Sequence, residues 1–179
     1  MRKFIIAVVA LFALVLTGCS TQAASAPDPS ASVAQPAALP EPTTEKPKNT
    51  IKSFGDVNTW NDGVSISVSE PAPFEVGEYA AGDVDGQTHV VYTLVLTNGS
   101  AEPLEPMVRT SVSSGGTEAS SIYDTGNALG DIGGSPTTVI LPGQTVKWLE
   151  AFSLADPNAV TLQVSPSFLH KDTVFTNIK

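Results

Sequence analysis

Beyond residue 50, apolar and polar residues alternate in short segments that are separated by turn residues. The clearest segment is 64–69, where Val64, Ile66 and Val68 alternate with three serines. In an extended strand, successive side chains point to opposite faces, so a period of two gives one buried and one solvated face. These segments therefore predict half-buried β-strands.

The same pattern predicts further strands at 90–97, 108–112, 145–154, 160–164 and 173–176. Turn signals separate them, and Asn61-Asp62-Gly63 is expected to close a hairpin between the segment near Trp60 and the strand that follows. No stretch has a convincing helical period, and only residues 123–129 could form one helical turn. Several short strands with this punctuation predict an all-β fold, an antiparallel β-sandwich.

The first eighteen residues have the composition of an export signal. Arg2 and Lys3 precede an unbroken apolar run over residues 4–16. As a helix, this run would span about 20 Å, which is less than the roughly 30 Å hydrocarbon core of a bilayer. We therefore predict that residues 1–18 are a cleaved signal peptide and not a membrane-spanning helix.

The apolar run ends in Leu16-Thr17-Gly18-Cys19, which resembles the lipobox of bacterial lipoproteins. Small side chains at Thr17 and Gly18 give a signal peptidase access to the backbone, and the Cys19 thiol can form a thioether with diacylglycerol. Two acyl chains, palmitate for example, are enough for stable anchoring. We expect a lipid-anchored protein on the outer face of the cytoplasmic membrane. An ordinary secretory signal with a chance cysteine is the alternative.

Residues 19–50 are predicted to be a disordered linker rich in Pro, Ala, Ser and Thr. The segment has no aromatic residue and contains six of the fourteen prolines. Such a composition buries too little apolar surface to offset the entropy lost on ordering. The expected organisation is therefore a signal peptide over 1–18, a lipidated linker over 19–50 and a folded domain over 51–179.

Charge and cysteine content limit the possible partners. The formal charge is −9, and removal of Arg2 and Lys3 leaves seven basic and eighteen acidic residues. Nucleic-acid binding needs clustered Lys and Arg, which the sequence lacks, so we exclude nucleic acid as a partner. Cys19 is the only cysteine, which excludes a disulfide within the chain, and a domain of this length can fold without one.

The order of motifs in the folded domain resembles a known family. The motifs are residues 91–100 ending in Thr97-Asn98-Gly99-Ser100, then Leu141-Pro142-Gly143, residues 151–157 and Val164-Ser165-Pro166. They look like the immunoglobulin-like domain of a largely uncharacterised family of actinobacterial extracellular lipoproteins, similar in fold to a mycobacterial immunoprotective secreted antigen. The resemblance covers about residues 52–178. It implies an immunoglobulin-like sandwich without the inter-sheet disulfide, and it implies no catalytic residues.

No motif predicts a metal, cofactor or catalytic site. The acidic segment 83–86 lacks the ligand spacing of an EF-hand, so we interpret it as a solvated loop. The glycines of 126–135 do not precede a helix, as a phosphate-binding loop requires, and this stretch is also interpreted as a loop. His89 and His170 are the only histidines and belong to no metal or hydrolase motif.

Three aromatic residues are candidates for binding. Trp60 lies beside a tight turn, and Tyr79 and Tyr123 lie in expected loops, where they could contact a partner. Partial burial at one end of the sandwich is the alternative for each. Trp148 is expected in the core. The function expected is presentation of a binding domain for an envelope protein or a glycan. The alternative is a structural or antigenic envelope protein without a discrete ligand, and no enzymatic activity is expected.

Glu150 is the residue at which the alternation and the chemistry disagree. A regular strand would place its carboxylate on the inward face with Trp148 and Phe152. Burying an unpaired carboxylate costs several kcal/mol or raises its pKa. We expect a bulge or an edge position to expose Glu150. The alternatives are a partner, for which Arg109 is the natural candidate, and a cavity with a functional purpose.

Overall fold

The computed structural model describes residues 50–179, which form thirteen β-strands and no helix. The signal peptide, the lipobox Leu16–Cys19 and the linker up to residue 49 lie outside the described residues. The strands are β1 (Thr50–Ser53), β2 (Val57–Thr59), β3 (Val64–Val68), β4 (Ala72–Pro73), β5 (Thr88–Asn98), β6 (Arg109–Ser114), β7 (Thr117–Glu118), β8 (Ser120–Ile122), β9 (Asp124–Asn127), β10 (Gly130–Ile132), β11 (Thr145–Leu154), β12 (Val160–Ser165) and β13 (Thr173–Thr176). Within this range, the structure contains no helix capable of crossing a membrane.

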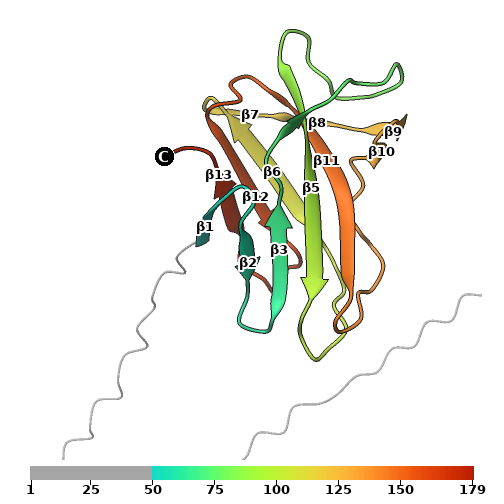
Figure 1. Ribbon diagram of the computed structural model, residues 1–179, viewed down its shortest axis with the longest axis vertical. Helices are drawn as coiled ribbons and strands as arrows, with labels where there is room; N and C mark the ends of the chain where they lie inside the picture. Colours follow the sequence, from blue (N-terminus) through green and yellow to red (C-terminus); the bar gives the residue numbers. More distant parts are fainter. Residues whose placement is uncertain (1–49) are drawn as a thin grey trace, which may run out of the picture. The chain divides into compact units, whose positions relative to one another are not determined.

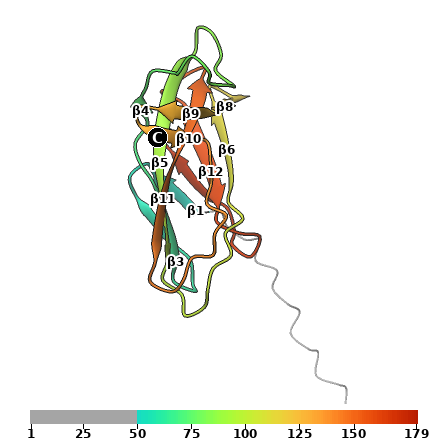
Figure 2. The same ribbon diagram turned by 90° about the vertical axis from the view of Figure 1, so that its right-hand side faces the viewer.

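The strands form two sheets that face each other as the layers of a sandwich (Figure 1), and the two layers are seen edge-on in Figure 2. One sheet has the order β1-β13-β12-β6-β7. The other has the order β2-β3-β5-β11-β10-β9, with β4 also paired to β5 and β8 to β11. The predicted all-β sandwich is confirmed. The pairing is antiparallel except between β1 and β13 and between β10 and β11, which are parallel.

The strands predicted from strong alternation occur where expected. The bounds of β11 and β13 match the predicted segments, and β3, β5 and β12 lie within two residues of theirs. The hairpin before β3 also forms, because Trp60 N donates to Val64 O at 2.9 Å and Gly63 N donates to Trp60 O at 3.0 Å. Gly63 has a φ of 95°, a conformation that side chains with a Cβ rarely adopt.

Residues 123–135 differ from the prediction. In place of a helical turn followed by a loop, they contain the short strands β9 and β10, which pair antiparallel beside β11. Ile132 of β10 is buried and packs in a small apolar cluster with Val91, Ile122 and Ala151. Strands of three or four residues, interrupted by glycine, are too short for a period of two to be recognised.

The main core lies between the two sheets and is built from alternate residues of the long strands. Its fully buried members include Ile66, Val68, Tyr92, Leu94, Leu96, Leu162, Val164 and Phe175. Trp148 is buried in the same cluster, which confirms its expected place in the core. The alternation therefore assigns inward and outward faces correctly along these strands.

Candidate functional site

Glu150 lies on the inward face of a regular strand. All ten residues of β11 pair with β5 in an unbroken register, and Glu150 is opposite Tyr92. The other side of β11 pairs with β8 and β10, so Glu150 is not on an edge strand. Its side chain is half-buried. The expected bulge or edge position is therefore wrong, because strand pairing on both sides of β11 holds the backbone in register.

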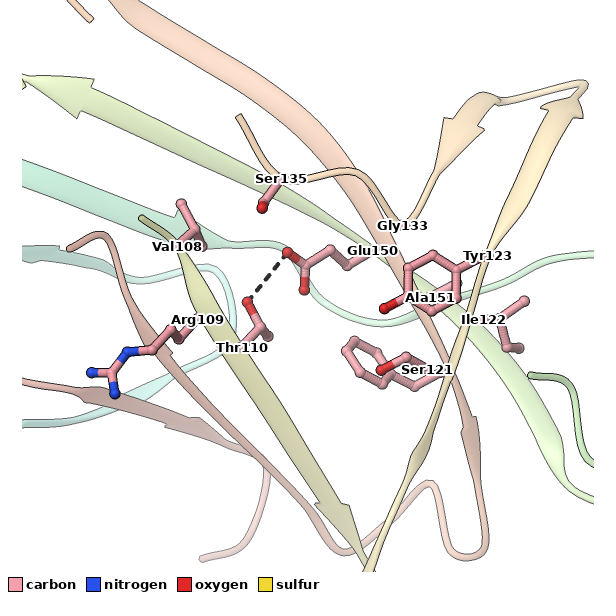
Figure 3. Close-up of a pocket in the computed structure, with 11 residues that line it drawn as sticks. Val108, Arg109, Thr110, Ser121, Ile122, Tyr123, Gly133, Ser135, Glu150 and Ala151 are labelled. Atoms are coloured by element: carbon pink, nitrogen blue, oxygen red, sulfur yellow. Dashed lines mark hydrogen bonds between the residues drawn. The ribbon is translucent and has the colours of Figure 1, made fainter. Parts of the chain in front are cut away.

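Two neighbouring side chains donate hydrogen bonds to the Glu150 carboxylate. Trp148 Nε1 donates to Oε1 at 2.7 Å, and Thr110 Oγ1 donates to the same oxygen at 3.2 Å, as Figure 3 shows for Thr110. The second oxygen, Oε2, accepts no hydrogen bond from residues 50–179. One half of the carboxylate is therefore satisfied by the protein, and the other half remains available as an acceptor.

Arg109 is not the partner of Glu150. Successive residues of β6 point to opposite faces, so Thr110 reaches Glu150 while the Arg109 guanidinium points away (Figure 3). Arg109 forms an ion pair with Asp172 at 3.3 Å and lies 5.3 Å from the ring centroid of Phe168. The alternative pairing of Arg109 with Glu150 is wrong for this reason.

The environment of Glu150 favours its neutral form. Burial raises the pKa of the Glu150 carboxyl above its usual value of 4.5, while the hydrogen bonds from Trp148 and Thr110 oppose that shift. Desolvation disfavours the charged form because a carboxylate loses its water shell, and donors to the carboxylate recover part of that loss. A positively charged ligand group next to Oε2 would compensate more of the solvation energy that the carboxylate loses on burial.

Glu150 lines a cavity of about 330 Å³ between β6 of one sheet and β8 and β11 of the other (Figure 3). Polar groups around it include the hydroxyls of Thr110, Ser121, Tyr123 and Ser135, and Arg109 lines it as well, with its guanidinium paired to Asp172. Its apolar wall is formed by Val108, Ile122, Ala151 and Phe152. Of the three possibilities for Glu150, the structure combines the second and the third, because two side chains donate hydrogen bonds to the carboxylate and the carboxylate also lines a cavity. An apolar wall with a few converging polar groups is typical of small-molecule sites.

The three candidate binding aromatics do not form one site. Tyr123 is 57% exposed and lines the Glu150 cavity. Trp60 is half-buried and lines a different cavity together with His170. Tyr79 is 88% exposed, in the connection between β4 and β5. Tyr123 is therefore the only one of the three that the structure places beside Glu150.

Both histidines form hydrogen bonds with neighbouring groups of the domain. His89 Nε2 donates to Val84 O at 3.3 Å, and His170 lies between Ser167 Oγ at 2.7 Å and Asp62 Oδ2 at 2.9 Å. Among residues 50–179, the structure brings together no group of three or more His, Cys, Asp or Glu side chains that could hold a metal ion.

Sequence reasoning did not single out Thr110 or Asn58. Thr110 lies between Val108 and Val112 on one face of the predicted strand. The alternation of this strand therefore predicts that Thr110 points inward. Asn58 lies in β2, a strand of three residues that has too little alternation to be predicted.

No family model matches the chain, and no curated protein matches it. Solved structures with a similar fold include the YjhA protein from Bacillus subtilis, with a TM-score of 0.55 and 10% identity over 70% of this chain and 98% of that chain. They also include MPT63, a secreted protein from Mycobacterium tuberculosis, with a TM-score of 0.47 and 13% identity over 72% of this chain and 98% of that chain. An uncharacterized β-sandwich protein from Clostridium difficile has a TM-score of 0.42 and 14% identity over 76% of this chain and 99% of that chain.

Fold and site together define a class, a β-sandwich protein with a polar cavity between its sheets. The likeness to YjhA supports this fold, and at 10% identity it carries no information about a ligand. A mycobacterial secreted protein, MPT63, is among the solved structures found. Membership of the actinobacterial lipoprotein family stays a prediction.

Proposed function

We propose that this protein is an extracytoplasmic lipoprotein, anchored through Cys19, whose β-sandwich binds a small cationic ligand in the Glu150 cavity. The observation that carries the proposal is the half-buried carboxylate of Glu150, with one oxygen open to a cavity. An apolar residue of similar size at this position would avoid the desolvation of a charged group. A binding role for the Glu150 carboxylate in the cavity explains why a charged group occupies this position. The role proposed is binding and not catalysis.

The chemistry of the cavity favours an ammonium group as the part of the ligand that is recognised. Oε2 of Glu150 can accept an N–H bond, and the hydroxyls of Thr110, Ser121 and Ser135 can accept others. Residues 50–179 carry fifteen of the eighteen acidic and five of the nine basic residues of the chain. This excess of negative charge attracts cations and speeds their encounter with the site. Phe152 and Ile122 provide an apolar wall for the carbon skeleton of the ligand.

The ligand proposal is tested with two probes that differ only in charge, 1,4-diaminobutane and 1,4-butanediol. We expect the full chain to bind the diamine in titration calorimetry at pH 7 and to bind the diol much more weakly. Glu150→Gln keeps the shape and one acceptor but removes the charge, so diamine binding should weaken about tenfold or more, which corresponds to about 1.4 kcal/mol. The exposed Glu118 of β7 provides the control Glu118→Gln, which should bind normally.

Equal diamine binding by the wild type and Glu150→Gln would contradict the proposed site. If neither the diamine nor the diol binds, the alternative function gains support, a structural or antigenic envelope protein without a discrete ligand.

The anchor is tested separately, by Cys19→Ser. Without the thiol there is no thioether to diacylglycerol, so we expect the protein to leave the membrane fraction for the medium or to accumulate as an uncleaved precursor. Fractionation and intact mass spectrometry measure both outcomes. A variant that stays in the membrane fraction at mature length would show that the lipobox interpretation is wrong.

A further inference from the structure

A second cavity, of about 450 Å³, lies between the two sheets at their β1 and β2 edges. These strands are adjacent to each other in Figure 1. Its lining includes Asn58 and Trp60 from the β2 side and Leu169, His170 and Lys171 from the β12–β13 connection. It shares no lining residue with the Glu150 cavity. Its volume is in the range of small-molecule sites.

Asn58 is the unusual residue of this cavity. It is 4% exposed, and among the described residues its amide is not one of the fully enclosed polar atoms that lack a hydrogen-bond partner, so the amide keeps contact with the cavity. An asparagine amide offers two donors and one acceptor, and buried polar groups in folded proteins almost always have partners. For comparison, Asn98 is fully buried and both donates and accepts hydrogen bonds through its side chain. The Asn58 amide is therefore positioned to hydrogen-bond a group that enters the cavity.

Trp60 provides a fixed aromatic wall next to Asn58. Its Nε1 donates to Lys171 O at 3.0 Å, and its ring meets the His170 ring edge-on at a centroid distance of 5.1 Å. Since the indole N–H is already bonded, the ring offers a ligand only its apolar surface. A ring held at both its N–H and its edge needs little ordering when a ligand packs on it.

Asp62 supplies an acceptor on the same side of the cavity. Its carboxylate accepts from Val64 N at 3.1 Å and contacts His170 Nε2 at 2.9 Å, while its side chain is 48% exposed. Burial alone would raise the pKa of Asp62, but the bonds from Val64 and His170 lower it overall, so the carboxylate stays ionised. Lys171 on the cavity wall carries the opposite charge, and the second carboxylate of the lining, Asp172, forms an ion pair with Arg109. The site therefore suits a neutral polar ligand.

From this geometry we propose that the cavity formed by Asn58, Trp60 and Asp62 binds carbohydrate. A saccharide ring has an apolar C–H face that packs on an aromatic ring, and hydroxyls at its rim that both donate and accept. The C–H face lies on the Trp60 indole, while hydroxyls bond the Asn58 amide and the Asp62 carboxylate. A site built to bond hydroxyls discriminates strongly against analogues that lack them. The site shares no lining residue with the Glu150 cavity, and the ion pair between Arg109 and Asp172 joins one lining residue of each.

The test uses N,N′-diacetylchitobiose and maltose as saccharide probes, with the open-chain polyol sorbitol and a capped tetra-alanine peptide as comparisons. Binding to the full chain is measured by saturation-transfer NMR and titration, in micelles of a detergent without a sugar head group. We expect at least one saccharide to bind, with transfer concentrated on one face of its ring, and sorbitol to bind much more weakly. Asn58→Leu and Trp60→Leu should each weaken saccharide binding about tenfold or more.

Two control variants separate this site from others. Tyr79→Leu removes an exposed aromatic ring elsewhere, and Glu150→Gln alters the other cavity, so both should bind saccharides normally. Because Trp60 packs against the core, its variant can fail to fold, whereas Asn58→Leu adds an apolar contact and is expected to fold. Undiminished saccharide binding by Asn58→Leu overturns the proposal. So do equal binding of sorbitol, a preference for the peptide, and the absence of saccharide binding to the wild type.

Discussion

Glu150 and Asn58 occupy comparable positions in the two halves of the sandwich. Both point inward from a strand, and both line a cavity between the sheets. Glu150 lies in the middle of a ten-residue strand with paired neighbours on both sides, and Trp148 and Thr110 donate hydrogen bonds to it. Asn58 lies on a three-residue edge strand, and its amide keeps contact with the cavity.

The difference shows that a nearby donor, and not the position in the sheet alone, decides whether an inward polar side chain is satisfied, because the Tyr92 hydroxyl of the inner strand β5 has no partner among the described residues. Next to an inner strand, side chains from the same and the facing sheet are close enough to donate. At an edge strand, one side has no neighbouring strand, and the polar group is left to solvent or a ligand. Glu150 is partly satisfied by donors from the protein, whereas the Asn58 amide depends on contact with the cavity. The following variants test this distinction.

The largest expected effect compares two asparagines. Asn98→Leu removes hydrogen bonds to Glu102 O, Ile140 O and Ser100, so it should lower the free energy of unfolding by about 3 kcal/mol. Asn58→Leu removes an amide that faces a cavity and forms no such network, so it should change that free energy by less than about 1 kcal/mol. Urea denaturation measures both. A strongly destabilised Asn58→Leu would show that Asn58 has a structural partner.

Trp148→Phe tests the compensation at Glu150. It removes the indole donor but keeps an aromatic ring, so we expect a loss of about 2 kcal/mol at pH 7, typical of a hydrogen bond to a charged group. In a Glu150→Gln background the same change should cost about half as much, because the acceptor is neutral. Equal losses in both backgrounds would mean that the Trp148–Glu150 bond does not offset the cost of burying the charge.

Tyr92→Phe examines an unpartnered polar group that lines neither of the two cavities. The Tyr92 hydroxyl is buried without a hydrogen-bond partner among the described residues, and its burial raises the pKa of the phenol. Its removal should stabilise the protein by about 1 kcal/mol while leaving diamine and saccharide binding unchanged. Thermal unfolding and calorimetry check the two parts. A change in ligand affinity would show that the Tyr92 hydroxyl contributes to one of the two sites.

The smallest expected effect is a difference in pH dependence between Glu150 and Asp62. The folded-state pKa of Glu150 is raised above 4.5, so its contribution to stability is present below that pH and lost as the pH rises through the folded value. The folded-state pKa of Asp62 is lowered below 3.8, so its contribution is present above that pH and lost on acidification.

The corresponding measurement is the free energy of unfolding of Glu150→Gln and Asp62→Asn relative to the wild type between pH 3 and 7. As the pH rises, the free energy of unfolding of Glu150→Gln should increase relative to that of the wild type. The free energy of unfolding of Asp62→Asn should decrease relative to that of the wild type. Parallel profiles would contradict the assigned environments of both carboxylates.

Much of the fold was predictable because long strands carry enough alternation to fix their faces. The strand 145–154 and the burial of Trp148 followed from the sequence. Glu150 was expected to be exposed by a bulge or an edge position, but it points inward from a regular strand. The partners of Glu150 did not follow, because Thr110 belongs to the other sheet and its approach depends on how the sheets pack. The strands β9 and β10 were missed because three or four residues, partly glycine, define no period.

The proposed site at Glu150 is tested most directly by NMR titration of the Glu150 carboxyl carbon with pH, in the absence and presence of saturating 1,4-diaminobutane. Burial in the cavity predicts a pKa above the usual 4.5 for the protein alone. A bound ammonium group favours the ionised carboxylate, so the diamine should lower that pKa. A Glu150 pKa that stays at its usual value in both titrations would contradict both the burial of the carboxylate and its role in binding a cation.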